Sequence, residues 1–364
     1  MHNRQWRTLL LAGLLILPLC ACGKTDGGIS SQSGGASGSE GPSVSVIVPV
    51  TDPEPLYVNP LTGEAVEEDP SGQRPFAIML NNLYKALPQV GVSKADVIYE
   101  IVAEGGVTRM MAVFQEFEGV GDLACVRSAR DYYVSLALGH DAVYIHAGGS
   151  PQAYSFIKKR GIDNIDLVNG PYYNTSWRDP ERRKKAGLEH SLFTSSENIL
   201  RDIKANISLE HEADYEVGWN FDKEAPAGGQ AAGKLSVRFS NSKTGEFTYD
   251  AAQGRYAILQ HISQKDVPYV DGADGTAVTV SSVLVLYTDV NQIRGDEKGR
   301  MEVRTTGTGD GLLLRNGQLY EITWRRNSET DCYSFLDKSG TSISLAVGPI
   351  YINVVSTDAQ VEWE

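Results

Sequence analysis

The chain has 364 residues, a formal net charge of −13 at pH 7 and 41% hydrophobic residues. The hydrophobic share is ordinary for a globular protein, so the length allows a substantial core and two domains. The acidic surface would repel phosphate backbones and anionic headgroups. We therefore expect no nucleic-acid partner and no electrostatic binding to membranes.

The N-terminus resembles the leader of a bacterial lipoprotein. A short cationic start is followed by an apolar run over residues 9–17, about half of what is needed to span a bilayer. Ala21 directly before Cys22, with Leu19 two positions further back, matches a lipobox. We expect residues 1–21 to be a signal peptide and Cys22 to carry a lipid such as palmitate. The alternative is a plain secretory signal, with Cys22 an incidental thiol.

A Gly/Ser-rich tether follows the lipidated cysteine, and together they span residues 22–50. Such a composition cannot bury enough apolar surface to fold, and it gives a reach of roughly 25–30 Å. The expected location is the cell membrane, with the protein lipid-anchored and facing the extracytoplasmic side. The expected partners are the membrane, through this anchor, and envelope proteins or cell-wall polymers.

An N-terminal mixed α/β domain is expected over residues 55–210. Alternating and continuous apolar runs predict strands, and helical periodicity with capping residues predicts helices. Thr194 is expected to open the last helix, with Glu197 completing a capping box. The expected strands are 76–80, 96–103, 108–116 and 142–147, and the other expected helices are 129–138 and 151–159.

A β-rich C-terminal domain is expected over residues 234–358, after a Gly-rich linker at residues 226–233. Nearly every apolar segment in it alternates, and turn signals such as Asn316-Gly317 separate them. The fold class is therefore α+β. The expected strands are 235–239, 247–249, 256–260, 283–287, 301–305, 311–314, 319–324 and 351–355.

The segment from Cys125 to Pro151 is the most informative part of the sequence. Ser128 is placed to cap the helix that follows it, and Ser150 to cap the next one. The helix and the returning strand have similar lengths, so the strand should end where the helix begins. Free helix amides at that edge favour an anionic or polar ligand. The candidate ligand residues here are Arg127, Ser128, Arg130, His146, Gly148, Gly149 and Ser150.

Four other polar residues are candidates for the same pocket. Glu104 and Arg109 flank a turn, so they form either an ion pair across it or, in the case of Glu104, an acid or base in the pocket. Asn81 and Asn82 either line the pocket or form a turn. The alternative for the whole group is two capped helices whose arginines pair with local acids.

Several chemistries lack support in the sequence. The histidines have no metal-ligand spacing, and there is no nucleophile elbow, P-loop or dinucleotide motif, so we expect no metal and no cofactor. Cys125 and Cys332 are either two buried thiols or a bridge. A basic run from Arg178 to Lys185, after the aromatic residues Tyr172, Tyr173 and Trp177, is either a solvated loop or a contact for an acidic partner or anionic wall polymer.

A set of motifs in this order resembles the YerB-type lipoprotein family. The motifs are Asn59-Pro-Leu-Thr-Gly63, Arg74-Pro75, Asn81-Asn82, Ala95-Asp96 to Tyr99-Glu100, Glu104-Gly-Gly with Thr108-Arg109, Val126-Arg-Ser-Ala-Arg130, His146 with Gly148-Gly-Ser-Pro151, His190, Gly307-Thr-Gly-Asp-Gly311 and Ile322-Thr-Trp324. This family often has Pro-His-Asn where this chain has Glu189-His190-Ser191. The resemblance implies paired N- and C-terminal domains and a lipid anchor, without a known reaction.

Two function hypotheses remain. The first is a non-enzymatic, membrane-tethered binding or scaffold protein of the cell envelope, and this is the function that we expect. The alternative is a hydrolase or transferase acting on wall polymers through Glu104, His146 and the arginines. A solute receptor is disfavoured, because the sequence shows no two similar lobes around a cleft.

Overall fold

The computed structural model describes residues 56–203, 207–212 and 215–364. The predicted signal peptide, lipidated Cys22 and tether lie outside these residues. Within the described ranges, no helix is both long enough and apolar enough to cross a bilayer.

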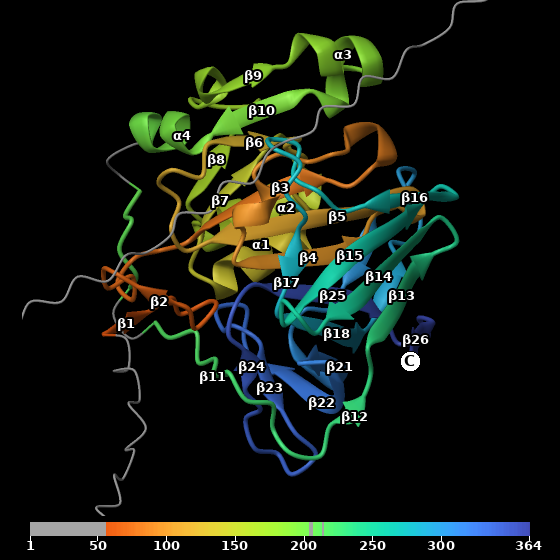
Figure 1. Cartoon of the computed structure of the whole chain (residues 1–364). Helices are drawn as coiled ribbons and strands as arrows, with labels where there is room; N and C mark the ends of the chain where they lie inside the picture. Colours follow the sequence, from red (N-terminus) through yellow and green to blue (C-terminus); the bar gives the residue numbers. More distant parts are fainter. Residues whose placement is uncertain (1–55, 204–206, 213–214) are drawn as a thin grey trace, which may run out of the picture. The chain divides into compact units, whose positions relative to one another are not determined.

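A large mixed sheet forms the centre of the body (Figure 1). It has 11 strands among the described residues, and its main path runs β12-β22-β21-β18-β25-β4-β5-β3-β7-β8, with β23 added beside β22. The strands from the first half of the chain are β3 (Phe76–Asn81), β4 (Val97–Val102), β5 (Thr108–Phe114), β7 (Val143–His146) and β8 (Asn164–Asp166). Those from the second half are β12 (Gln230–Ala231), β18 (Ser282–Thr288), β21 (Gly307–Arg315), β22 (Gln318–Arg326), β23 (Ser334–Leu336) and β25 (Ile350–Ser356).

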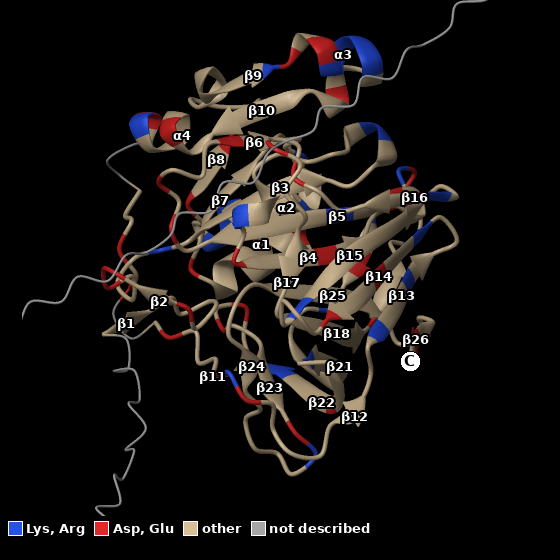
Figure 2. Ribbon diagram, in the orientation of Figure 1, with Lys and Arg blue, Asp and Glu red and all other residues tan. Residues whose placement is uncertain are grey.

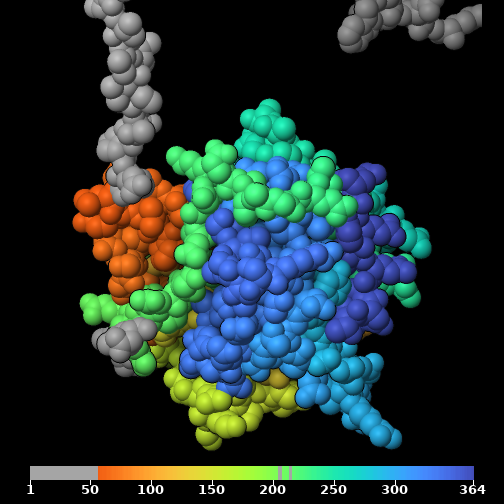
Figure 3. All heavy atoms as spheres, turned by 90° about the horizontal axis from the view of Figure 1, so that it is seen from below, coloured from red at the N-terminus to blue at the C-terminus, as the bar shows by residue number. Residues whose placement is uncertain are grey.

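The two halves of the chain meet inside this sheet. The penultimate strand of the chain, β25, lies parallel to both β18 and β4, and places Asn353 opposite Glu100. In Figure 3, the segment between the two halves of the chain, in green, lies across blue residues of the C-terminal half. It contributes the short strand β12 beside β22, and β11 (Phe221–Asp222) beside β24 (Leu345–Ala346).

Both faces of the large sheet are buried, which explains why its strands are apolar throughout. In β3, Phe76, Ile78 and Leu80 join one hydrophobic core, and Ala77 and Met79 join the core on the opposite face. A second, antiparallel sheet packs on the first face, and helices α1 (Asp131–Gly139) and α2 (Pro151–Arg160) cover the other. The second sheet contains β13 (Lys234–Ser240), β14 (Lys243–Asp250), β15 (Arg255–Ile262), β16 (Lys265–Pro268), β17 (Thr279–Val280) and β26 (Val361–Trp363).

A small lobe, formed by β6 and the segment after β8, occupies the top of Figure 1. Its sheet has the order β6-β10-β9, and two short helices flank it. The elements are β6 (Asp122–Ala124), β9 (Ser176–Arg178), α3 (Pro180–Ala186), β10 (Leu192–Ser195) and α4 (Ser196–Asp202). The remaining strands form the pairs β1 (Tyr57–Val58) with β2 (Ala65–Val66), and β19 (Val290–Gln292) with β20 (Met301–Val303).

The α+β class is confirmed, and each strand and helix predicted above has a counterpart. Two capping predictions are wrong. Ser128 does not cap α1, because the following Ala129 forms a bridge with Gly149 and is extended, which delays the helix until Asp131. Thr194 remains in β10, and Ser195 caps α4 by accepting a hydrogen bond from the amide of Asn198.

Candidate functional site

The segment before α1 is held between two parallel strands. The Arg127 amide donates to the carbonyl of Met79 on β3, and the Arg127 carbonyl accepts from the Ala147 amide, which follows β7. The Ala129 amide then donates to the carbonyl of Gly148 at 2.9 Å. The end of β7 therefore returns to the start of α1, as the element lengths predict.

Two arginines share one carboxylate beside this segment. Arg109 Nη2 lies 3.1 Å from Glu104 Oε2, and the Nε of Arg130 donates to the other Glu104 oxygen. Arg109 also donates to the Ser128 carbonyl at 2.5 Å. Burial raises the pKa of Glu104, but the two arginines outweigh it and hold that pKa below its usual range. Glu104 is therefore a fixed carboxylate.

His146 is enclosed by the protein. Its Nδ1 lies 2.8 Å from the Gly148 carbonyl, and its Nε2 lies 3.1 Å from Oδ1 of Asn164. The ring is fully buried, so both nitrogens are committed to internal partners. Ser150 is likewise structural, because its hydroxyl accepts from the Ala153 amide and caps α2 as predicted.

Gly148 and Gly149 form the turn between β7 and α2. Gly148 has a φ of +71°, which disfavours other residues, and its amide donates to Asp166. A Cβ on Gly149 would meet the Cβ of Ala129 at 3.4 Å, which is an ordinary van der Waals contact, so the space there does not demand a glycine. Asp166 was not anticipated from the sequence: it also accepts from the hydroxyl of Tyr154 at 2.6 Å, and this aspartate therefore orders the turn between β7 and α2.

Asn81 and Asn82 belong to different environments. Nδ2 of Asn81 lies 3.0 Å from Nδ1 of His190, near the surface. Asn82 is buried, and its amide donates to Glu100 and to Gln260 at 2.9 Å each. The two asparagines therefore do not line one pocket.

Asn82 belongs to a buried polar network that was not predicted from the sequence. Glu100 on β4 is fully buried and accepts from Thr108 at 2.5 Å and from Tyr351 at 2.6 Å. Lys243 of the second sheet lies 3.1 Å from Glu100 and is only 2% exposed. Burial lowers the pKa of Lys243, and the charge of Glu100 opposes that shift. No sequence spacing connects residues so far apart along the chain.

Four Lys and Arg side chains and one histidine, exposed or half-buried, lie around Arg127, and we call them the basic face: Lys85, Arg127, Arg178, Arg183 and His190. Burial, then the charges of Arg127 and Lys85, lower the pKa of His190. Burial, then the charges of Arg183 and Arg127, lower the pKa of Arg178. Positive charge therefore accumulates here on an acidic protein, around α3 and the neighbouring turn at residues 84–86 (Figure 2).

The lobe behind the basic face is well packed. Arg182 donates to the carbonyls of Ala86 and Pro88 and contacts the sulfur of Cys125, and its guanidinium lies 5.3 Å from the ring centre of Phe193. Trp177 stays 37% exposed, whereas Tyr172 is buried and provides no stacking surface.

Cys125 and Cys332 are both free thiols, so no disulfide bridge joins them. Cys332 lies 3.4 Å from Nδ1 of His140, beside a cavity of about 630 Å³. Burial raises the pKa of Cys332 to about 12 and lowers that of His140 to about 3. A neutral thiol beside a neutral imidazole is not an activated nucleophile.

A second cavity, of about 720 Å³, is acidic and lies near β2. Its lining includes Glu67, Glu68, Asp69, Glu116 and Glu118. No group of three or more potential metal ligands comes together among the described residues. None of the proposed ligand residues lines either cavity.

These features define an α+β body in which one large sheet joins both halves of the chain. Residues 61–210 match the N-terminal domain, and residues 235–352 the C-terminal domain, of the family described as "Protein of unknown function (DUF3048)". The chain belongs to this family.

A relative and a solved structure agree with that assignment. "Putative lipoprotein YerB" of Bacillus subtilis (strain 168) is 29% identical over 303 residues, which cover 81% of this chain and 85% of that protein. The crystal structure of YerB from Bacillus subtilis matches with a TM-score of 0.71 at 26% identity, and covers 84% of this chain and 99% of that one. The resemblance to YerB-type proteins is confirmed, and the chain is lipoprotein-like.

Proposed function

We propose that the mature protein is a lipid-anchored binding protein of the bacterial cell envelope, that it acts outside the membrane without catalysing a reaction, and that it takes an anionic ligand. The lipobox at Cys22 and the similarity to a protein named as a lipoprotein support the anchor. The anionic ligand rests on one observation: the basic face gathers four Lys and Arg side chains and His190 on a chain with a net charge of −13.

The contacts of the predicted acid–base residues favour binding over catalysis. Glu104 is held by two arginines, which stabilise its charged form. Both ring nitrogens of His146 are occupied inside the protein. A general acid or base must reach a proton of the substrate, and neither group is free to do so in this arrangement.

Arg109 and Arg130 extend the positive charge inward from the basic face. Their side chains are about one-tenth exposed, and Arg127 and Arg130 both add to the positive potential at Arg109. An anion bound beside Arg127 would thus also be attracted by Arg109 and Arg130, which it does not contact.

The anchor is tested by mass spectrometry of the membrane fraction with wild type and Cys22→Ser. We expect an acylated N-terminal cysteine in the wild type and release of the variant from the membrane. A mature wild-type chain without acyl groups would contradict the anchor.

The ligand is tested with an anionic polymer, poly(glycerol phosphate), and a neutral one, dextran. Wild type should bind the anionic polymer alone, with an affinity that falls as salt rises. An Arg127→Ala/Arg130→Ala variant should lose most of that binding. An Arg201→Ala variant should keep it, since the side chain of Arg201 is hydrogen-bonded to Asn198 and Asp202, away from the basic face. Equal binding of both polymers would contradict an anionic ligand.

A further inference from the structure

The guanidinium of Arg127 already holds an anion that the protein itself supplies. Its Nη2 lies 2.8 Å from Oε2 of Glu189, a carboxylate that is 66% exposed on the short turn Leu188–His190. The backbone of Arg127 is hydrogen-bonded on both sides, to Met79 and Ala147. The backbone that carries this cation is therefore fixed in the frame of the large sheet, whereas the carboxylate faces solvent and is weakly held.

His190, the residue after Glu189, is half-buried and carries a hydrogen-bond donor without an internal partner among the described residues. Oδ1 of Asn81 accepts from the Leu83 amide at 3.1 Å, which fixes the orientation of the Asn81 side-chain amide. Its NH₂ group then faces Nδ1 of His190 at 3.0 Å, so Nδ1 is the acceptor. The neutral ring must carry its proton on Nε2. This N–H has no hydrogen-bond partner among the residues that the structure describes.

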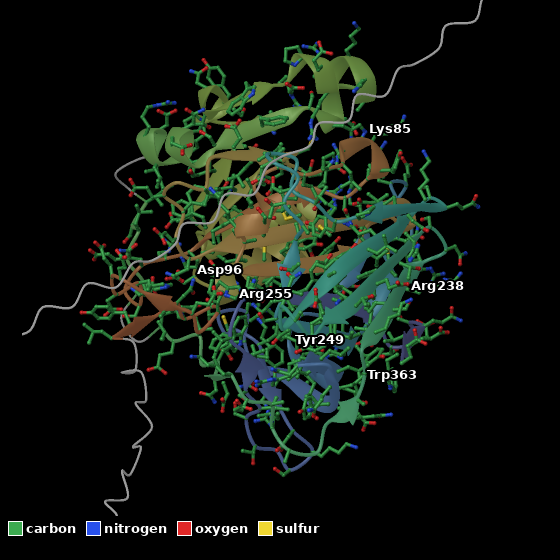
Figure 4. The ribbon with its side chains drawn as sticks, in the orientation of Figure 1. Lys85, Asp96, Arg238, Tyr249, Arg255 and Trp363 are labelled. Carbon is green, nitrogen blue, oxygen red and sulfur yellow. The ribbon has the colours of Figure 1, made fainter. Side chains whose placement is uncertain are left out.

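The surroundings of this pair carry more positive than negative charge. The charges of Arg127 and Lys85 both act on His190, and Arg127 also acts on Arg178, with Glu189 as the opposing carboxylate. Lys85 is labelled in Figure 4, on the turn below α3. The Glu189 carboxylate does not balance these positive charges. An added anion would therefore reduce the repulsion between them.

We infer that the position now occupied by the Glu189 carboxylate is the subsite for a phosphodiester group of an envelope polymer, which displaces Glu189 from Arg127 and accepts a hydrogen bond from Nε2 of His190. This inference rests on the anionic ligand proposed above and names its chemical class. One unesterified oxygen of the phosphodiester would replace the Glu189 carboxylate on the guanidinium, which leaves the second oxygen as the acceptor for the imidazole. The site lies on the surface, so a group within a long polymer reaches it as easily as a small molecule.

The inference predicts opposite effects for the two partners of the ion pair. Arg127→Ala removes the main donor and should weaken binding of poly(glycerol phosphate) about tenfold or more. Glu189→Gln removes the internal competitor and should strengthen binding about two- to fivefold, the range expected from an exposed ion pair. A variant that merely disturbed folding would not bind more tightly.

The experiment is calorimetric titration of the mature chain carrying Cys22→Ser, with Arg201→Ala as the matched control and thermal unfolding as the check on folding. Weaker binding by Arg127→Ala together with tighter binding by Glu189→Gln supports the subsite. Weaker binding by Arg127→Ala with unchanged or weaker binding by Glu189→Gln overturns the subsite and leaves the anionic ligand standing. Absence of polymer binding by the wild type and all variants overturns both.

Discussion

Lys243 and Glu100 lie 3.1 Å apart between the two large sheets, almost completely removed from water. Glu100 belongs to the N-terminal family domain and Lys243 to the C-terminal one. The pair therefore couples the two halves of the chain through an electrostatic contact in the core, in addition to the shared sheet. Because each charge is buried only in the presence of the other, loss of either one should be costly.

Lys243→Met should destabilise the protein by about 3–5 kcal/mol, because it leaves the Glu100 carboxylate buried without its counter-charge. Urea unfolding measures the change. Lys338→Met is the matched control, since Lys338 is 76% exposed in its pair with Glu321. A combined Lys243→Met/Glu100→Gln variant should recover part of the loss. A single variant as stable as the control would show that the pair does not hold the halves together.

Asp96 should make stability fall as pH rises from about 4 to about 7. Burial, assisted by the charges of Glu64 and Glu116, raises its pKa from 3.8 to about 7 in the folded protein. Within that window the folded state holds a proton that the unfolded state has lost, so each added pH unit favours unfolding by up to about 1.4 kcal/mol. Asp96→Asn should remove this contribution to the slope, which unfolding at several pH values measures. An identical slope in the variant would contradict the raised pKa.

Cys332 should resist alkylation in the folded protein. Its thiol pKa of about 12 leaves almost no thiolate at pH 8, and burial also raises the pKa of Cys125. Mass spectrometry after iodoacetamide treatment should find neither residue modified until urea is added. Rapid native labelling of Cys332 would show that the thiol is activated and would reopen a nucleophilic role beside the cavity.

Glu104→Gln should destabilise the protein by about 2 kcal/mol or more, because Arg109 and Arg130 would then face each other with little exposure and no shared carboxylate. Glu321→Gln is the control, an exposed acid whose loss should cost less than about 0.5 kcal/mol. Chemical denaturation compares the two. If Glu104→Gln were as stable as Glu321→Gln, solvent rather than Glu104 would balance the charges of Arg109 and Arg130.

The local elements were predictable because each depends on nearby residues. The strand expected over 108–116 is β5, and its alternate residues Met110, Ala112 and Phe114 join one hydrophobic core. Ser150 and Pro151 marked the start of α2 correctly. The cap of α1 was predicted wrongly because the bridge between Ala129 and Gly149, a tertiary contact, decides where that helix begins.

The candidate site was predictable in its backbone and only partly in its chemistry. The return of β7 to the start of α1 follows from element lengths, but the directions of the side chains do not. Arg127 points to Glu189 and Arg130 to Glu104, whereas His146 turns inward to Asn164. The network around Glu100 joins residues from three distant segments, and single-sequence patterns carry no information about such pairings.

The place of β25 in the sheet has a consequence for folding. Residues 350–356 lie far from β4 in the sequence, yet they fill the gap between β18 and β4. A chain that ended at residue 349 would expose two unpaired strand edges and could not close its central sheet. Closure of the central sheet therefore depends on pairing between segments far apart in the sequence, and contacts of this non-local kind slow folding.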